Sequence, residues 1–227
     1  MNAATNEAAL DTVILDLDGT LVDTVYQHVL AWRSAFLSVG VDIPAWRIHR
    51  AIGMGGDRLV AEVAGRAVEN AVGDEVRRLH GLRFEDLLPH VTPTDGAPGL
   101  LEALRSRDLK VVVASSGERE ITERLLTVLG AAETLHAWVA GDQADSSKPA
   151  GDLLGLAMEK VSGEAALVIG DTVWDVESAQ ACDFPCVGVL TGGVSDAELS
   201  EAGALDVREN PAAITSDLDD LLKRARP

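Results

Sequence analysis

The chain has 227 residues, of which 47% are hydrophobic and 25% charged, a balance typical of a globular protein with one large or two modest domains. Its 37 acidic and 19 basic side chains give a net charge of −18, and a surface this acidic repels nucleic acid and anionic lipid. No apolar run approaches the roughly 18 residues needed to cross a bilayer, and the start, MNAATNEAAL, lacks the basic residues of a secretory signal. These features predict a cytoplasmic protein with no nucleic-acid partner and no membrane partner.

The first predicted element is a buried strand over Thr12–Leu15, because a short apolar run there is bounded by turn-forming residues. Two aspartates, Asp16 and Asp18, follow this strand at once. Burying unpaired carboxylates is unfavourable unless their pKa rises, a partner binds them or a metal neutralises them. The pair taken alone could also be an ordinary strand end that caps a turn, since aspartate is common in turns.

Helical patterns fill the next segment, from about Thr24 to His90, and no convincing strand is evident in it. The helices are expected over Val25–Val39, Ala45–Ala51, Arg58–Val68 and Asp74–Leu88. Helix-breaking residues separate them, among them Gly40, Pro44, the run Gly53–Gly56 and Gly73. A helical block of this length between two strands predicts a small separate domain over 24–90.

Short strands alternate with helices in the rest of the chain. The strands are expected at Lys110–Ala114, Ala137–Ala140, Ala165–Ile169 and Pro185–Val189. The helices are expected at Gly99–Arg107, Arg119–Leu129, Ala150–Val161, Val173–Ala181 and Asp196–Glu201. This alternation predicts an α/β fold, a doubly wound, Rossmann-like parallel sheet over 1–23 and 91–227 with the small α-helical domain inserted in it.

Polar side chains follow four of the predicted strands. They are Asp16 and Asp18, Ser115 and Ser116, Lys148, and Asp171 and Asp175. Ligands of open α/β sheets bind at the carboxyl ends of the strands, so these groups should face one crevice. Four aspartates with one lysine leave an excess of negative charge, and carboxylate oxygens suit Mg²⁺. A carboxylate beside a metal ion and a lysine can attack phosphorus, which points to phosphoryl transfer.

Four short motifs in this order, DLDGT, VVVASS, SKP and GDTVWD, resemble the motifs of the haloacid-dehalogenase-like (HAD) superfamily. The resemblance extends over nearly the whole chain, because the helical segment lies where that family has its helical cap. The chain is most similar to the helical-cap subgroup of phosphoglycolate phosphatases and β-phosphoglucomutases. This implies a HAD-like core over 1–23 and 91–227, a cap over 24–90, and Mg²⁺ as the cofactor.

The resemblance also implies a role for each motif residue. Asp16 would be the phosphoryl-accepting nucleophile and Asp18 the general acid and base. Phosphate would bind to Ser115, Ser116 and Lys148. The metal ligands would be Asp16, the backbone carbonyl of Asp18, and Asp171, with Asp175 supporting them. This division of labour requires a raised pKa at the acid, Asp18, and a pKa kept low by the metal at the nucleophile, Asp16.

Each motif residue taken alone also has an ordinary structural explanation. Ser115 could be a strand-end hydroxyl and Lys148 a lysine at a helix start. Asp171 could cap the following helix, a position that aspartate favours.

The cap segment bears on the substrate. The stretch YQHVLAW is similar to the cap start of β-phosphoglucomutase-like proteins, and this places His28 near Asp18. Gly55 and Arg58, in the loop GMGGDR, are further candidates for substrate contact, although a plain turn between helices explains that loop equally well.

The sequence thus favours a Mg²⁺-dependent phosphatase of small phosphomonoester metabolites, acting through an aspartyl-phosphate on Asp16, as a monomer or weak homodimer. The alternative is a phosphosugar mutase, which would need a cation for a second phosphate. The arginine expected in the cap falls at Gly56. A third reading is a non-enzymatic phospho-acceptor signalling or binding module. Such receivers carry their acceptor after the third strand, whereas Asp16 follows the first.

Overall fold

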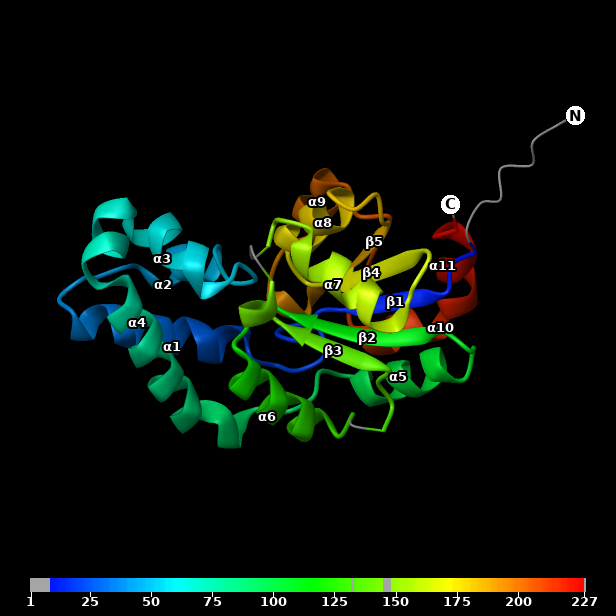
Figure 1. Ribbon diagram of the computed structural model, residues 1–227, viewed down its shortest axis with the longest axis horizontal. Helices are drawn as coiled ribbons and strands as arrows, with labels where there is room; N and C mark the ends of the chain where they lie inside the picture. The colour runs from blue at the N-terminus through cyan, green and yellow to red at the C-terminus, as the bar shows by residue number, and fades with distance from the viewer. Residues whose placement is uncertain (1–8, 132, 145–147, 227) are drawn as a thin grey trace, which may run out of the picture.

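The computed structural model describes residues 9–131, 133–144 and 148–226 and has an α/β fold built on a parallel sheet (Figure 1). The strands of the described residues are β1 (Thr12–Leu15), β2 (Lys110–Ser115), β3 (Ala137–Ala140), β4 (Ala166–Gly170), β5 (Cys186–Val189) and β6 (Asp206–Arg208). Their order in the sheet is β3-β2-β1-β4-β5-β6, and every neighbouring pair is parallel. The predicted doubly wound α/β class is confirmed.

Strand β1 lies in the middle of the sheet and is buried along its whole length. Leu15, its last residue, pairs with Val113 of β2 on one side and with Ile169 of β4 on the other. Because alternate residues of a strand point to opposite faces, Leu15 packs in one hydrophobic cluster and Ile14 in another. Because both faces of the sheet are buried, the strand sequences are short continuous apolar runs.

Helices cover both faces of the sheet (Figure 1). One face packs against α5 (Ala97–Arg105), α6 (Arg119–Leu129), α10 (Pro211–Ser216) and α11 (Leu218–Arg224). The other packs against α7 (Asp152–Val161), α8 (Val173–Gln180) and α9 (Asp196–Ala202). Short 3₁₀ helices are η1 (Leu88–His90), η2 (Gly141–Gln143) and η3 (Leu190–Gly192).

A helical insert separates β1 from β2 in the sequence and lies to the left of the sheet in Figure 1. It consists of α1 (Val25–Ser38), α2 (Ala45–His49), α3 (Gly56–Ala64) and α4 (Arg66–Leu87). The four helices share a third hydrophobic cluster, in which Phe36, Ile48 and Val76 are fully buried. That the insert is a separate domain over 24–90 stays a prediction.

Three parts of the chain differ from the sequence prediction. The helix expected over Arg58–Val68 is divided, because the backbone turns at Gly65, where φ is 86°. Gly73, expected as a break, lies inside α4. A single glycine weakens a helix by only about 1 kcal/mol relative to alanine, which packing against other helices can offset. The segments β6, α10 and α11 were not predicted. Strand β6 has only three residues, all partly exposed, and no clear alternation of apolar and polar side chains.

Candidate active site

The carboxyl ends of β1 and β4 bring buried charges together. Asp16 follows β1, and Asp171 follows the neighbouring β4. Asp175 lies in the first turn of α8. Lys148, just before α7, donates from Nζ to Asp16 and, over 2.6 Å, to Oδ1 of Asp175. All four side chains are buried, so the structure assembles in one place four residues that the sequence singled out separately.

One lysine does not balance three buried carboxylates. Burial alone would lower the pKa of Lys148, but Asp16 and Asp175 raise it above its ordinary value. Burial, together with the charges of Asp175 and Asp18, raises the pKa of Asp16 to about 7, although Lys148 opposes this. Burial, together with the charges of Asp16 and Asp175, raises the pKa of Asp171 well above its usual range. The cluster therefore has a deficit of positive charge.

The oxygen atoms of this cluster fit a divalent cation. One oxygen from each of Asp16, Asp171 and Asp175 lies within 4.8 Å of the others. Both oxygens of Asp175 are already used, since Oδ1 accepts from Lys148 and Oδ2 from the backbone and hydroxyl of Thr172. Asp171 accepts from Thr20 on Oδ1, whereas its buried Oδ2 has no hydrogen-bond partner among the described residues. A hard, oxygen-only donor set of this kind suits Mg²⁺.

Two glycines make room for the unpartnered oxygen of Asp171. A β-carbon at Gly19 would lie 2.3 Å from this oxygen, and one at Gly192 would lie 1.9 Å from it. Both distances are far below a van der Waals contact. The turn DLDGT therefore needs glycine at its fourth position, where φ is 84°. The backbone thus approaches Asp171 closely at the proposed metal site.

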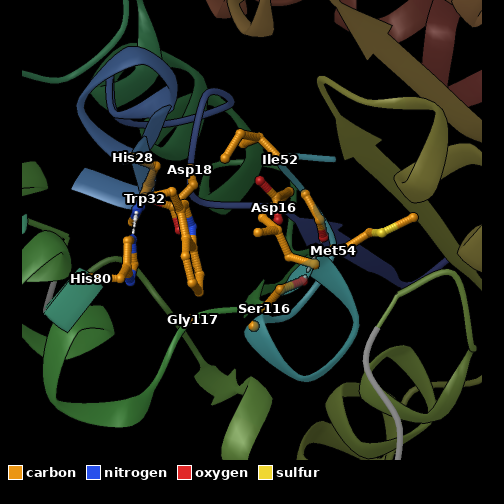
Figure 2. Close-up of a pocket in the computed structure, with 12 residues that line it drawn as sticks. Asp16, Asp18, His28, Trp32, Ile52, Met54, His80, Ser116 and Gly117 are labelled. Atoms are coloured by element: carbon orange, nitrogen blue, oxygen red, sulfur yellow. Dashed lines mark hydrogen bonds and ion pairs between the residues drawn. The ribbon is translucent and has the colours of Figure 1, made fainter. Parts of the chain in front are cut away.

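Asp18 lies beside Asp16 on the same cavity but has different partners (Figure 2). Its Oδ1 is 2.7 Å from the hydroxyl of Thr24 and 2.9 Å from Nε2 of His28. Burial alone would raise the pKa of Asp18, but His28 and Thr24 lower it below its usual value. The protein groups by themselves thus give the reverse of the expected order, with the higher pKa at Asp16.

A second histidine, His80 of α4, stands behind His28. The ring nitrogens His28 Nδ1 and His80 Nε2 are 3.0 Å apart, and the ring of His80 stacks on Trp32 with centroids 3.9 Å apart. Burial, and then the neighbouring His28, lower the pKa of His80 well below its ordinary value. The sequence prediction missed His80, because a single histidine in a helical pattern carries no signal of its own.

The two serines predicted to bind phosphate differ in their contacts. Ser115, the last residue of β2, is buried and accepts the backbone N–H of Gly117 over 3.0 Å. Ser116 donates its hydroxyl to the backbone carbonyl of Gly53 in the insert, over 2.9 Å. Ser115 therefore shapes the turn below the cavity, while Ser116 joins the sheet to the insert.

A cavity of about 70 Å³ lies between the sheet and the insert, above Asp16 (Figure 2). We call its two sides the sheet wall and the insert wall. The sheet wall consists of Asp16, Asp18, Ser116 and Gly117. The insert wall consists of His28, Trp32, Ile52, Met54, Leu59 and His80, with Gly53 and Gly56 between them.

Of the three insert residues proposed from the sequence, only His28 belongs to this lining. Gly55 is buried at the start of α3, and Arg58 is exposed to solvent. Their neighbours Met54 and Gly56 line the cavity instead.

Hydrogen bonds and an ion pair hold the insert against the sheet. Besides the bond from Ser116 to Gly53, Nε2 of His49 lies 2.9 Å from the carbonyl oxygen of Gly192. Arg50 pairs with Glu198 of α9 at the surface. These contacts hold the insert over the aspartate cluster.

Comparisons with known proteins agree with this geometry. A family model described as haloacid dehalogenase-like hydrolase matches residues 10–183. The chain is 28% identical over 207 residues to validoxylamine A 7'-phosphate phosphatase of Streptomyces hygroscopicus subsp. limoneus, covering 85% of this chain and 91% of that one. It is 29% identical over 186 residues to phosphoglycolate phosphatase of Aquifex aeolicus, covering 80% and 85%. A crystal structure of a hydrolase from Pseudomonas syringae has a TM-score of 0.89 and 34% identity, covering 93% of this chain and 99% of that one.

Proposed function

The chain belongs to the haloacid dehalogenase-like hydrolase family, and we propose that it is a Mg²⁺-dependent phosphatase that acts through an aspartyl-phosphate on Asp16. Its substrates are small phosphorylated metabolites, as the names of its relatives suggest. The observation that carries the proposal is the buried cluster of Asp16, Asp171, Asp175 and Lys148 at the floor of the cavity between the sheet and the insert.

Asp16 is the proposed nucleophile because it alone of the three clustered carboxylates also lines the cavity. In the first half-reaction a carboxylate oxygen of Asp16 bonds to phosphorus as the bond from phosphorus to the leaving oxygen breaks. Lys148, fixed by Asp175, would stabilise the negative charge at this point. Mg²⁺, held by Asp16, Asp171 and the backbone carbonyl of Asp18, would neutralise phosphate charge and orient the ester for in-line attack.

Asp18 is the proposed general acid and base. It would protonate the leaving alkoxide and then take a proton from the water that attacks the acyl phosphate, which regenerates Asp16 and releases inorganic phosphate. A phosphate ester bound beside Asp18 adds like charge and so raises its pKa, while a cation beside Asp16 lowers the pKa there. Substrate and metal together would thus produce the pKa order that the free protein lacks.

The insert would control the access of water to the reacting phosphate. The bond from Ser116 to Gly53 and that between His49 and Gly192 close the cavity, and closure keeps bulk water from the reacting phosphate. Opening would then release the alcohol and later the phosphate.

A phosphosugar mutase is less well supported. Such an enzyme has to hold a second phosphate, but no lysine or arginine among the described residues lines the cavity. Hydrolysis needs only the one phosphate site that the aspartate cluster provides.

Location and assembly remain predictions. Within the described part of the chain, no helix has both the length and the apolar character required to traverse a bilayer. We propose a cytoplasmic protein that acts as a monomer or weak homodimer.

The test is phosphate release from a panel of phosphosugars, phosphoglycolate and other small monoesters, with Mg²⁺ and with a chelator. We expect Mg²⁺-dependent release from a subset of compounds, lost in the Asp171→Asn variant. Release that is unaffected by chelation would contradict the metal-dependent mechanism.

A further inference from the structure

Among the described residues, the insert wall contains no lysine or arginine. Its side chains are the apolar Trp32, Ile52, Met54 and Leu59 and the two histidines. The desolvated His80 is held neutral, since burial lowers its pKa well below the usual value. His28 is already hydrogen-bonded to Asp18 over 2.9 Å. The leaving group of a substrate would contact this wall, because the phosphate has to reach Asp16 on the opposite side.

Two cations near the cavity are occupied elsewhere. Lys148 is enclosed between Asp16 and Asp175. Arg77 of α4 lies directly behind the wall, where it donates to the carbonyl of Gly56 over 3.1 Å, but it is bound by both Glu69 and Asp74. The residues outside the described ranges contain no lysine or arginine at all.

We propose that the cavity selects phosphomonoesters whose leaving alcohol carries no negative charge, and that it rejects esters whose leaving group bears a carboxylate or a second phosphate. This inference rests on the proposed function, because it assumes that the phosphate binds at Asp16. It names a substrate class narrower than small phosphorylated metabolites.

The physical reason is the lack of a positive partner for such a leaving group in the cavity lining. An anionic leaving group would face a wall without lysine or arginine and would lie beside the carboxyl groups of Asp16 and Asp18. Burying an unpaired charge is strongly unfavourable, and a like charge nearby adds to the penalty.

A matched pair of esters tests the selection. 2-Hydroxyethyl phosphate and phosphoglycolate have the same two-carbon skeleton, but only phosphoglycolate carries a carboxylate in the leaving group. We expect kcat/KM for 2-hydroxyethyl phosphate to be on the order of 100-fold higher. A ratio below about tenfold would overturn the inference.

Gly56 offers a site at which to add the missing charge. A β-carbon there would lie 3.4 Å from the ring of Trp32 and from the side chain of Arg77, which is van der Waals contact. Gly56→Lys should reduce the preference for 2-hydroxyethyl phosphate by about tenfold or more. Gly56→Met, an uncharged side chain of similar length, should not. If the ratio of kcat/KM for the two esters were the same in Gly56→Lys and Gly56→Met, selection by charge would be contradicted.

A binding measurement separates this inference from the proposed function. Calorimetry on the Asp16→Asn protein with Mg²⁺ compares the affinities of the two esters without turnover. Tighter binding of 2-hydroxyethyl phosphate supports the inference even if the wild type releases no phosphate, in which case the proposed function alone fails. Equal binding, tighter binding of phosphoglycolate, or no binding of either ester overturns the inference.

Discussion

The sheet wall and the insert wall contribute opposite kinds of side chain to one cavity. The sheet wall holds Asp16 and Asp18, and directly behind it lie Asp171, Asp175 and Lys148, all buried. The insert wall holds apolar side chains and two histidines. The sheet wall accounts for the type of reaction, whereas the insert wall, which has no lysine or arginine, would determine which alcohol is released.

The two walls also differ in how their side chains are held. Charges on the sheet side follow strand ends that the parallel ladder fixes, as β1 and β4 fix Asp16 and Asp171. Residues on the insert side are held by packing between helices, as Trp32 and His80 stack on one another. Chemistry at strand ends can therefore persist while the helical wall varies.

The largest expected effect is loss of turnover when the nucleophile on the sheet wall is removed. Asp16→Asn should lower phosphate release by at least about 10⁴-fold. Its melting temperature should change little, because Lys148 keeps Asp175 as a partner. Parallel measurements of phosphate release and thermal unfolding check this. A folded variant with more than about one hundredth of the activity would exclude Asp16 as nucleophile.

Removing the buried cation Lys148 should affect folding next most strongly. Lys148→Met leaves three buried carboxylates without a positive partner and should destabilise the fold by about 3–5 kcal/mol near pH 8. The folded-state pKa values of Asp16 and Asp171 already lie above the unfolded value and would rise further. The folded state then binds more protons than the unfolded state, so the loss should shrink as the pH falls towards 4.

Urea unfolding of Lys148→Met at several pH values measures this effect, with the exposed Lys223→Met as the matched control. A pH-independent difference between the two variants would contradict the charge deficit on the sheet side.

Binding of Mg²⁺ should stabilise the folded protein. At a free concentration of 100 times its dissociation constant, a ligand that binds only the folded state adds about 2.7 kcal/mol. Asp171→Asn should reduce this gain, because it alters the unpartnered oxygen at the proposed site. Thermal unfolding with and without Mg²⁺ tests this, with Asp57→Asn in the exposed part of α3 as control. If Mg²⁺ stabilised Asp171→Asn and Asp57→Asn equally, the metal would have to bind at another site.

The insert wall should make stability depend on pH through His80. Burial lowers the pKa of His80 in the folded state well below 6.5. Below pH 6.5 the unfolded state therefore binds more protons than the folded state, and the folded protein becomes less stable as the pH decreases. The loss should approach about 1.4 kcal/mol per pH unit below that value. His80→Gln should remove this contribution, while the exposed His90→Gln should retain it. Unfolding curves at pH 7.5 and 5.5 would show the difference.

The smallest effect is expected at the surface pair that joins the two sides. Arg50→Ala removes the ion pair with Glu198, of which the arginine side chain is 51% exposed. Such surface pairs contribute about 0–1 kcal/mol. The variant should therefore unfold nearly as the wild type does, and kcat/KM should change by less than about threefold. A large loss of turnover would show that this pair is needed for closure.

The sequence allowed the sheet wall to be predicted far better than the insert wall. Five strand ranges agree with the structure within about one residue at each end, because buried parallel strands are short apolar runs. Asp16, Lys148, Asp171 and Asp175 could be grouped because each follows a strand that ends at the same sheet edge. Periodicity does not show which side chains of a helical pair face a cavity, so His80, Met54 and Gly56 were missed.

The most direct test of the central claim is to trap the covalent intermediate on Asp16. Wild-type protein mixed with Mg²⁺ and a hydrolysed ester would be quenched in acid within its turnover time, digested and analysed by mass spectrometry. We expect one added phosphoryl group on the peptide that contains Asp16, and none with the chelator or in Asp16→Asn. Rapid phosphate release with no phosphorylated peptide at any quench time, or a phosphoryl group on another residue, would contradict the account.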